Sequence, residues 1–167
     1  AKSVQEEKIN DNGKKIYFHI IGDGQELDNL KKYAHDNGIQ NVIFHGRKPS
    51  EEMPRYYTFA DAMIVTLTAN PLVSLTLPAK VQSYMAAGKP ILASANGEIA
   101  NVIKESGAGF CAHADDDSEF VDIVKLFLNN EERYNMGKNA RKYYVNNFSK
   151  EIVMDKLEKI LIKEAIY

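Results

Sequence analysis

The chain has 167 residues, of which 44% are hydrophobic and 26% charged, so it suits a globular domain and is not disordered, collagen-like or a coiled coil. Its formal net charge of −2 argues against a nucleic-acid-binding protein held by phosphate contacts. The single cysteine, Cys111, excludes a disulfide framework and a zinc site built from several thiolates. No apolar run approaches the roughly 20 residues of a membrane-spanning helix.

The start of the chain predicts one strand between two helices. Residues 3–12 suit a short helix or its remnant, and Lys15–Ile21 is an apolar run that predicts a buried strand ending at Gly22-Asp23-Gly24. Glu26–Asp36 then predicts a helix that Asn37-Gly38 ends. The apolar side chains of this helix repeat at helical spacing: Leu27, Leu30, Tyr33 and Ala34.

Two further strands enclose the next helix. Asn41–His45 predicts the second strand, which Gly46 closes, and Ala62–Leu67 predicts the third. Between them a helix is expected to open at Pro49-Ser50. Ser50 is its expected N-cap, because a serine oxygen accepts from the first free amides and the acidic residues that follow suit the positive helix end.

The middle of the chain continues the alternation. Thr68–Leu77 predicts an uncharged loop, and Pro78–Gly88 predicts a helix with Gly88 as its C-terminal stop. Strands are expected over Pro90–Ser94 and Gly109–Ala112, on either side of a short helix over Ile99–Ser106.

The last fifty residues predict helices alone. One begins at Asp115–Asp117 and runs to about Asn129. The tail, Glu131–Asn147 and Ser149–Ile166, is expected as two helices with Ser149 as an N-cap, or as one kinked helix.

Together these elements predict an α/β fold over residues 1–167 as a single domain. Strands that alternate with helices favour right-handed βαβ units, and almost continuously apolar strands are typical of a parallel sheet covered on both faces. We therefore expect a Rossmann-like parallel sheet with helices on both faces and a helical C-terminal tail.

Ligands of such sheets bind beyond the carboxyl ends of the strands, near helix N-termini. Gly22-Asp23-Gly24 lies there, where its amides suit an anion, but it is equally consistent with a tight turn. A dinucleotide-binding fingerprint needs a third glycine where Leu27 stands, and the chain has no Gly-Lys-Ser or Gly-Lys-Thr. A hydride-transfer enzyme and a P-loop NTPase are therefore not predicted.

The loop before Pro78 is the most informative candidate. It carries hydroxyl groups and no charge, and the first turn of the following helix exposes unpaired amides. Lys80 lies in that turn, where a cation is unfavourable beside the positive helix end. A bound phosphate removes the conflict, and the alternative is a lysine that simply reaches solvent.

The histidines are weaker candidates. His45 follows a strand, where a ligand-binding residue is expected, whereas His19 lies within a strand and suits a core or edge position. His35 suits a solvated helix face, His113 precedes an acidic run and is expected to have little role, and Cys111 suits a small buried apolar residue. No pair of histidines has metal-ligand spacing, so neither a metal ion nor another cofactor is predicted.

The order of these motifs resembles the C-terminal, donor-binding domain of a family 4 (group 1) GT-B glycosyltransferase. The resemblance covers roughly residues 15–150 and is strongest at Tyr84–Pro90, followed by a strand and preceded by the GDG and FHG turns. The stretches that carry it are YFHIIGDGQELDNLKKYA, NVIFHGRKPSEEMPRYYTFADAMIV, LPAKVQSYMAAGKPILAS, NGEIANVIKESGAGFCAHADD and NMGKNARKYYVNNFS.

The resemblance implies metal-independent transfer of a sugar, with retention, from a nucleoside-diphosphate sugar of the UDP or GDP type to a saccharide or lipid-linked acceptor. Pro78-Ala79-Lys80 resembles members that build bacterial surface polysaccharides. The base and ribose would lie against His45-Gly46-Arg47 and the helix over Pro78–Ser83, and the diphosphate against the amides of Leu75–Leu77. The expected nucleotide-sugar-binding residues are Gly22, Gly24, His45, Gly46, Arg47, Ser74, Leu75, Thr76, Leu77, Lys80 and Ser83.

Three positions depart from the family pattern. Its Glu-x7-Glu pair maps onto Leu75 and Ser83, and the glutamate expected after the later glycine-rich turn maps onto Asn101. No catalytic residue is therefore assigned, and the donor base and sugar stay open. The departures favour, as the alternative, a doubly wound module that binds a nucleotide or regulates without catalysis. A receiver domain is disfavoured because Asp23 and Asp61 are not placed as an acidic pocket.

The resemblance also implies that an acceptor domain, together with the first strand and glycine-rich loop of this domain, precedes Ala1 in a longer protein. We therefore expect that this chain alone does not transfer sugar and that the acceptor domain is its partner. A cytoplasmic location, peripheral at the inner membrane face, is expected, with membrane contacts lying mainly in that other half.

Overall fold

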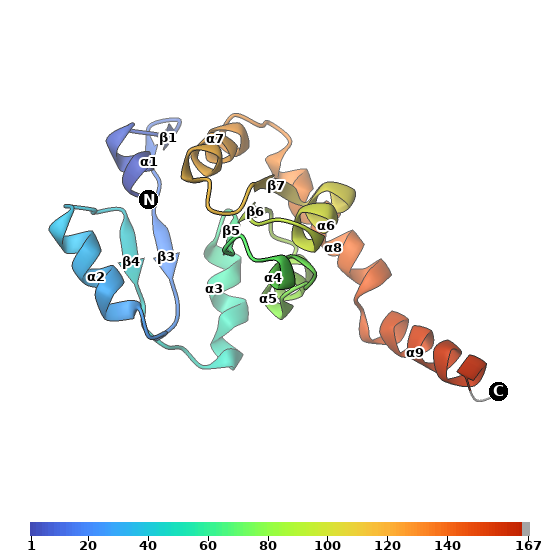
Figure 1. Cartoon of the computed structure of the whole chain (residues 1–167). Helices are drawn as coiled ribbons and strands as arrows, with labels where there is room; N and C mark the ends of the chain where they lie inside the picture. Colours follow the sequence, from blue (N-terminus) through green and yellow to red (C-terminus); the bar gives the residue numbers. More distant parts are fainter. Residues whose placement is uncertain (165–167) are drawn as a thin grey trace. The chain divides into compact units, whose positions relative to one another are not determined.

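A computed structural model describes residues 1–164, in which strands and helices alternate before a helical C-terminal tail (Figure 1). The chain divides into two compact units, residues 1–56 and residues 57–167. The predicted end of the last helix, at Ile166, lies outside the described residues.

The first unit begins with a helix and a hairpin instead of the single helix predicted over residues 3–12. Helix α1 (Lys2–Glu6) is followed by β1 (Asn10–Asp11) and β2 (Lys14–Lys15), which pair antiparallel. Asn12 and Gly13 form the turn with φ values of 51° and 85°. Asn-Gly is the preferred pair for a two-residue hairpin turn with positive φ, so the signal was present in the sequence.

A parallel pair of strands completes this unit, and its elements are β3 (Phe18–Ile20), α2 (Leu27–Asp36), β4 (Val42–Phe44) and the 3₁₀ turn η1 (Ser50–Glu52). The predicted burial of the strands is wrong here, because Ile20 and Ile43 are each 37% exposed. Leu30 and Tyr33 of the predicted apolar helix face are about half exposed as well. A sheet of only two strands has little area for other elements to pack against, so its apolar side chains stay partly exposed.

Helix α3 (Met53–Phe59) follows η1 directly. Ser50 is not the predicted N-cap, because its hydroxyl donates to Glu51 Oε1 at 2.9 Å and Pro49 occupies the cap position of η1. The pKa of Glu51 lies below its usual range because its own backbone amide, and then the Ser50 hydroxyl, bind its carboxylate.

The second unit is built on a three-stranded parallel sheet, in the order β5 (Met63–Thr66), β6 (Ile91–Ser94), β7 (Gly109–Ala112). The register pairs Met63 with Ile91 and Ile91 with Gly109. All four residues of the central strand β6 are buried, which confirms the prediction made from its continuous apolar run.

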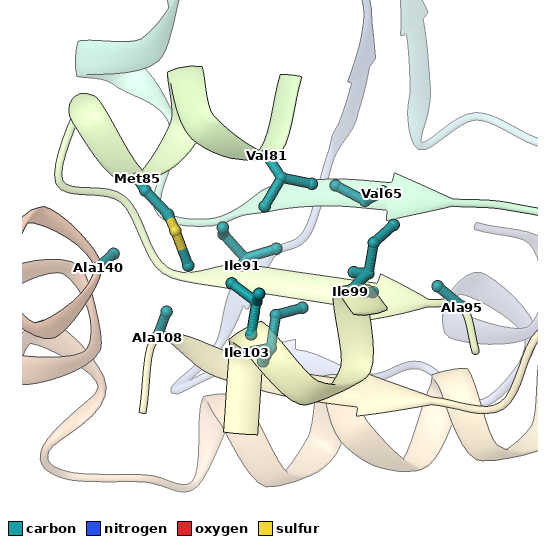
Figure 2. Close-up of a cluster of buried hydrophobic side chains, with 11 residues drawn as sticks. Val65, Val81, Met85, Ile91, Ala95, Ile99, Ile103, Ala108 and Ala140 are labelled. Atoms are coloured by element: carbon teal, nitrogen blue, oxygen red, sulfur yellow. The ribbon is translucent and has the colours of Figure 1, made fainter. Parts of the chain in front are cut away.

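Helices cover both faces of this sheet (Figure 1). The main core joins β5 and β6 to α5 (Ala79–Ala86), α6 (Glu98–Ser106) and α8 (Arg133–Asn147), as Figure 2 shows. Helix α7 (Asp117–Leu128) contacts β6 and β7 but contributes no residue to that cluster. Because successive strand residues point to opposite faces, α7 covers the other one, with buried apolar residues of its own: Val121, Ile123, Val124 and Phe127.

The structure decides two local predictions in this unit, one for the loop after β5 and one for the C-terminal tail. The loop predicted over Thr68–Leu77 contains a one-turn helix, α4 (Pro71–Ser74), because Asn70 Oδ1 accepts from the amides of Leu72 and Val73 and so caps it. The tail forms two helices, α8 and α9 (Lys150–Glu164), with Ser149 Oγ accepting from the Ile152 amide at 3.5 Å.

Candidate functional site

The predicted site residues fall into two sets, one in each unit. In the first unit, backbone hydrogen bonds bring the GDG and FHG turns together at the carboxyl ends of β3 and β4. The Gly22 amide donates to the Gly46 carbonyl at 2.9 Å, and the His45 amide donates to the Ile20 carbonyl at 2.9 Å. Gly46 has a φ of 66°, which a residue with a side chain adopts only at a cost.

Two polar pairs lie at these turns. A ring nitrogen of His45 lies 2.8 Å from a ring nitrogen of His19, and the Tyr56 ring packs against the His45 ring at an angle of 60° between the ring planes. Arg47 and Asp23 are 3.9 Å apart, and the Arg47 side chain is 81% exposed. An exposed ion pair at this distance contributes little, so the guanidinium is available to a second anion.

In the second unit, the predicted hydroxyl groups already have partners. Each donates to a backbone carbonyl of its own turn: Ser74 Oγ to Asn70 at 3.0 Å, Thr76 Oγ1 to Val73 at 2.8 Å and Ser83 Oγ to Ala79 at 3.1 Å. A hydroxyl hydrogen serves one acceptor well at a time. Donation to a phosphate therefore requires these groups to rotate.

The start of α5 has free donors. Pro78 occupies the cap position, and the amides of Ala79 and Lys80 lie in the first turn, where no earlier helical carbonyl is available to accept from them. The Lys80 side chain is exposed and has no hydrogen-bond or ion-pair partner within residues 1–164. Leu77 packs against the core cluster and anchors this end of the loop, whereas Leu75 is 80% exposed.

Gly97 positions this loop and was not predicted. A Cβ atom at Gly97 would lie 2.2 Å from the Ser74 carbonyl oxygen, so the two backbones are in direct contact. Gly97 also has a φ of 71° at the cap of α6. The strand-to-helix turn Asn96-Gly97 was visible in the sequence, but its contact with residues more than twenty positions earlier was not.

A hydrogen bond to a side chain fixes the start of the same loop. The Ala69 amide donates to Asp115 Oδ2 at 2.7 Å, and Asp116 Oδ1 caps α7 by accepting from the Glu119 amide at 2.8 Å. The acidic run therefore begins a helix, as predicted. Glu119 in turn accepts from the amide and the ring of His113, and these bonds, the amide first, lower its pKa.

The YMAAGKP stretch has structural contacts. Lys89 Nζ donates to the carbonyls of Thr58 at 3.0 Å and Ala60 at 2.9 Å, at the C-terminal end of α3. Tyr84 packs edge-on against Tyr57 with ring centres 5.5 Å apart. Burial, and secondly the neighbouring Tyr57, raise the pKa of Tyr84.

The remaining candidates do not form a second site. Cys111 is partly buried with Sγ 3.3 Å from the Ala95 carbonyl, and burial raises the pKa of its thiol. Among the described residues, no three His, Cys, Asp or Glu side chains are grouped as metal ligands. A surface hollow of about 500 Å³ along α8, beside Gly88, contains none of the predicted site residues.

Parallel strands, helices on both faces and loops gathered at strand ends define a Rossmann-like α/β chain. It belongs to the group 1 glycosyl transferases, whose family model matches residues 3–143. The chain is 31% identical over 148 residues to the probable glycosyltransferase WbjE of Pseudomonas aeruginosa, covering 85% of this chain and 36% of that protein. It is 28% identical over 138 residues to spore coat protein SA of Bacillus subtilis, covering 79% and 35%. The chain thus spans about a third of the length of these two relatives.

Solved structures share the fold. HepE of Anabaena, in complex with UDP, has a TM-score of 0.75 at 18% identity over 89% of this chain and 41% of its own. TarM of Staphylococcus aureus, in complex with UDP among other ligands, has a TM-score of 0.71 at 18% identity over 95% and 30%. Their likeness over most of this chain confirms the predicted fold class, with its helical tail. Within residues 1–164, no helix is long and apolar enough to cross a membrane.

Proposed function

We propose that this chain is the donor-binding domain of a retaining glycosyltransferase that takes a hexose from a nucleoside-diphosphate sugar. The observation that carries the proposal is the start of α5, where Lys80 is exposed, has no partner among residues 1–164 and lies beside the free amides of the first helical turn. A phosphate group at that place is stabilised by the amides, the helix dipole and the lysine charge together.

In the second unit, the diphosphate would accept from the amides of Leu77, Ala79 and Lys80 and from the Lys80 ammonium group. Ser74, Thr76 and Ser83 would contribute their hydroxyls only after leaving their present carbonyl partners. Charge that develops on the leaving diphosphate is stabilised by donors that are already oriented, which is the usual electrostatic contribution to such a transfer.

In the first unit, the turns at Gly22–Gly24 and His45–Arg47 would contact the base and ribose. The backbone bond between Gly22 and Gly46 holds the two turns in register, and the exposed Arg47 supplies a positive charge. The two glycine-containing turns leave the backbone open to a flat ligand.

The wider role follows from the relatives. The name of one relative, the lipopolysaccharide core biosynthesis glycosyltransferase LpsE of Rhizobium meliloti, supports a role in bacterial surface polysaccharide synthesis. The acceptor in this proposal is a saccharide or a lipid-linked saccharide. We assign the acceptor site to an N-terminal domain of the same protein, and the location to the cytoplasmic side of the inner membrane.

A second candidate function is nucleotide binding without catalysis. Leu75 and Ser83 stand where the family has a pair of glutamates, Leu75 offers no side-chain hydrogen bond, and the Ser83 hydroxyl is occupied by its own helix. Nucleotide binding by the longer protein, combined with no transfer to any acceptor, would favour this candidate.

Saturation-transfer NMR of the 167-residue chain with UDP, GDP, dTDP, CMP and NAD in turn tests the proposal. We expect one nucleoside diphosphate to bind and NAD to give no signal. Lys80→Ala should then weaken that binding by roughly 1–3 kcal/mol, the value of a charge-assisted contact. Lys138→Ala, which removes another exposed lysine, is the matched control and should change nothing.

Two results would count against the proposal. Silence from all five ligands would contradict donor binding by this chain. Equal affinity of Lys80→Ala and wild type would remove Lys80 from the site, and an equal loss in Lys138→Ala would show that only the general charge of the chain matters.

A further inference from the structure

The His19–His45 pair is a hydrogen bond of well-defined geometry. The Nδ1 atom of His19 lies 2.8 Å from Nε2 of His45, the ring centres are 5.1 Å apart and the ring planes differ by 14°. The distance between the ring centres is close to the largest value that the 2.8 Å bond allows, which is the bond length plus the distance from each ring centre to its bonded nitrogen. The rings therefore meet edge to edge in nearly one plane, as an N–H···N bond along an in-plane lone pair requires, and not face to face.

The backbone explains why the rings meet. His19 pairs with Ile43 in the parallel ladder, and His45 is two residues beyond Ile43. Side chains two apart project on the same face of a strand, so His45 lies one step along the face that His19 occupies. The bond from the His45 amide to the Ile20 carbonyl holds this register at the strand end.

We infer that His19 is a positioning residue for nucleotide recognition, because it fixes the orientation and the tautomer of the His45 ring. The recognition step rests on the proposed function, in which His45 contacts the nucleotide. The Tyr56 ring packs against the His45 ring, and within residues 1–164 neither histidine ring has another side-chain hydrogen-bond partner. The bond to His19 is therefore the polar contact that orients the His45 ring.

The bond also links the protonation of the two rings. A neutral imidazole has one N–H and one acceptor nitrogen. If His19 Nδ1 donates, His45 carries its proton on Nδ1, and if His45 Nε2 donates, His19 carries its proton on Nε2. Both rings therefore hold the same tautomer, and His45 Nδ1, the nitrogen left for a ligand, is a defined donor or a defined acceptor.

The test is ¹⁵N NMR of the histidine rings of the 167-residue chain at pH 8, with and without nucleotide. We expect the same tautomer in both rings. His19→Phe keeps an aromatic ring without nitrogen, so His45 should become a mixture of tautomers and the affinity for the bound nucleoside diphosphate should fall about 3- to 10-fold, the loss of one neutral hydrogen bond. His19→Asn places an amide near the former Nδ1 and should restore both.

His35→Phe is the matched control, since His35 is an exposed histidine of the same unit whose ring lies beside Asp36. It should leave both the His45 ring signals and the affinity unchanged. Opposite tautomers in the wild type, or a His45 signal that His19→Phe does not alter, would overturn the positioning role.

Failure of the proposed function and failure of the positioning role give different results. If the wild type binds no nucleotide, the proposed function fails, while the ring signals of the free protein still decide whether His19 governs His45. If nucleotide binds and His19→Phe changes the His45 tautomer but not the affinity, the role in recognition fails and the proposed function stands.

Discussion

The two units support their parts of the predicted site in different ways. In the first unit, the buried apolar residues among those described are Val4 and Ala34, and the GDG and FHG turns are held by backbone and ring hydrogen bonds. In the second, a large apolar core (Figure 2) includes residues of α5, and Leu77 of the loop that leads to Lys80 packs against it.

This difference decides which substitutions should matter where. Apolar burial is non-directional and depends on the volume of the buried side chains. It therefore fixes a loop indirectly, by fixing the strands and helices to which the loop is joined. Hydrogen bonds between turns are directional and individually modest, so they define local geometry with little contribution to total stability. We expect loss of volume to act mainly on the second unit and loss of a polar contact mainly on the first.

The largest effect is expected from Met85→Ala compared with Leu30→Ala. Met85 is fully buried in the core and Leu30 is 47% exposed on α2. Removing the buried side chain leaves a cavity and should lower the free energy of unfolding by about 2–5 kcal/mol, whereas Leu30→Ala should cost about 1 kcal/mol or less.

Urea unfolding with hydrogen exchange of peptides from both units measures this prediction. Met85→Ala should speed exchange in β5, β6 and α5, and Leu30→Ala only in the first unit. Equal losses from the two variants would show that the exposed helix face contributes as much as the core.

The next largest loss of stability is expected from a glycine substitution, and we compare one glycine from each unit, Gly97 and Gly24. Gly97 has a φ of 71° and its backbone touches that of Ser74, whereas a Cβ at Gly24 meets nothing within 4 Å and its φ is not positive. Gly97→Ala should cost about 2–3 kcal/mol, and Gly24→Ala should stay within about 0.5 kcal/mol.

Thermal unfolding and the crystal structure of Gly97→Ala give the measurement. We expect a displaced Ser74–Leu77 segment and weaker nucleotide binding in Gly97→Ala. An unchanged melting temperature, with the loop in place, would mean that the contact between Gly97 and Ser74 is easily relieved.

Much of the fold was predictable because it depends on local pattern. The continuous apolar run over β6, the glycine at the end of α2 and the strand at Gly109–Ala112 each leave a signal in a few consecutive residues. Burial is different, because it depends on what packs against a strand. The runs at β3 and β4 are as apolar as β6, yet these strands are only partly buried.

The site was predictable only as a set of loops. The position of Lys80 in a first helical turn follows from Pro78 nearby in the sequence. The contact between Gly97 and Ser74, and the bond between His19 and His45, join residues 23 and 26 positions apart. Such pairings arise from the strand register and the packing, which a single sequence does not display.

The smallest effect is expected at two exposed carboxylates, Glu119 and Glu51. Both have a lowered pKa, Glu119 through the amide and ring of His113 and Glu51 through its own amide and the Ser50 hydroxyl. A group whose pKa is lower in the folded state stabilises the fold above its unfolded pKa, and this contribution disappears as the pH falls through the folded pKa. Glutamine mimics the protonated form, so each variant should melt lower than wild type at pH 7.

The difference from wild type should shrink as the pH falls below 4.5 and through the lowered pKa of each folded carboxyl group, because wild type then loses the same charge. Glu119→Gln should show the larger difference, since its bonds join the end of β7 to the first turn of α7, whereas those of Glu51 stay within one turn. Melting curves between pH 7 and pH 3 decide the matter. A difference that grows on acidification would show that the ionised carboxylates do not stabilise the fold. A larger loss in Glu51→Gln would show that the local turn in the first unit depends more on its charge than the packed second unit does.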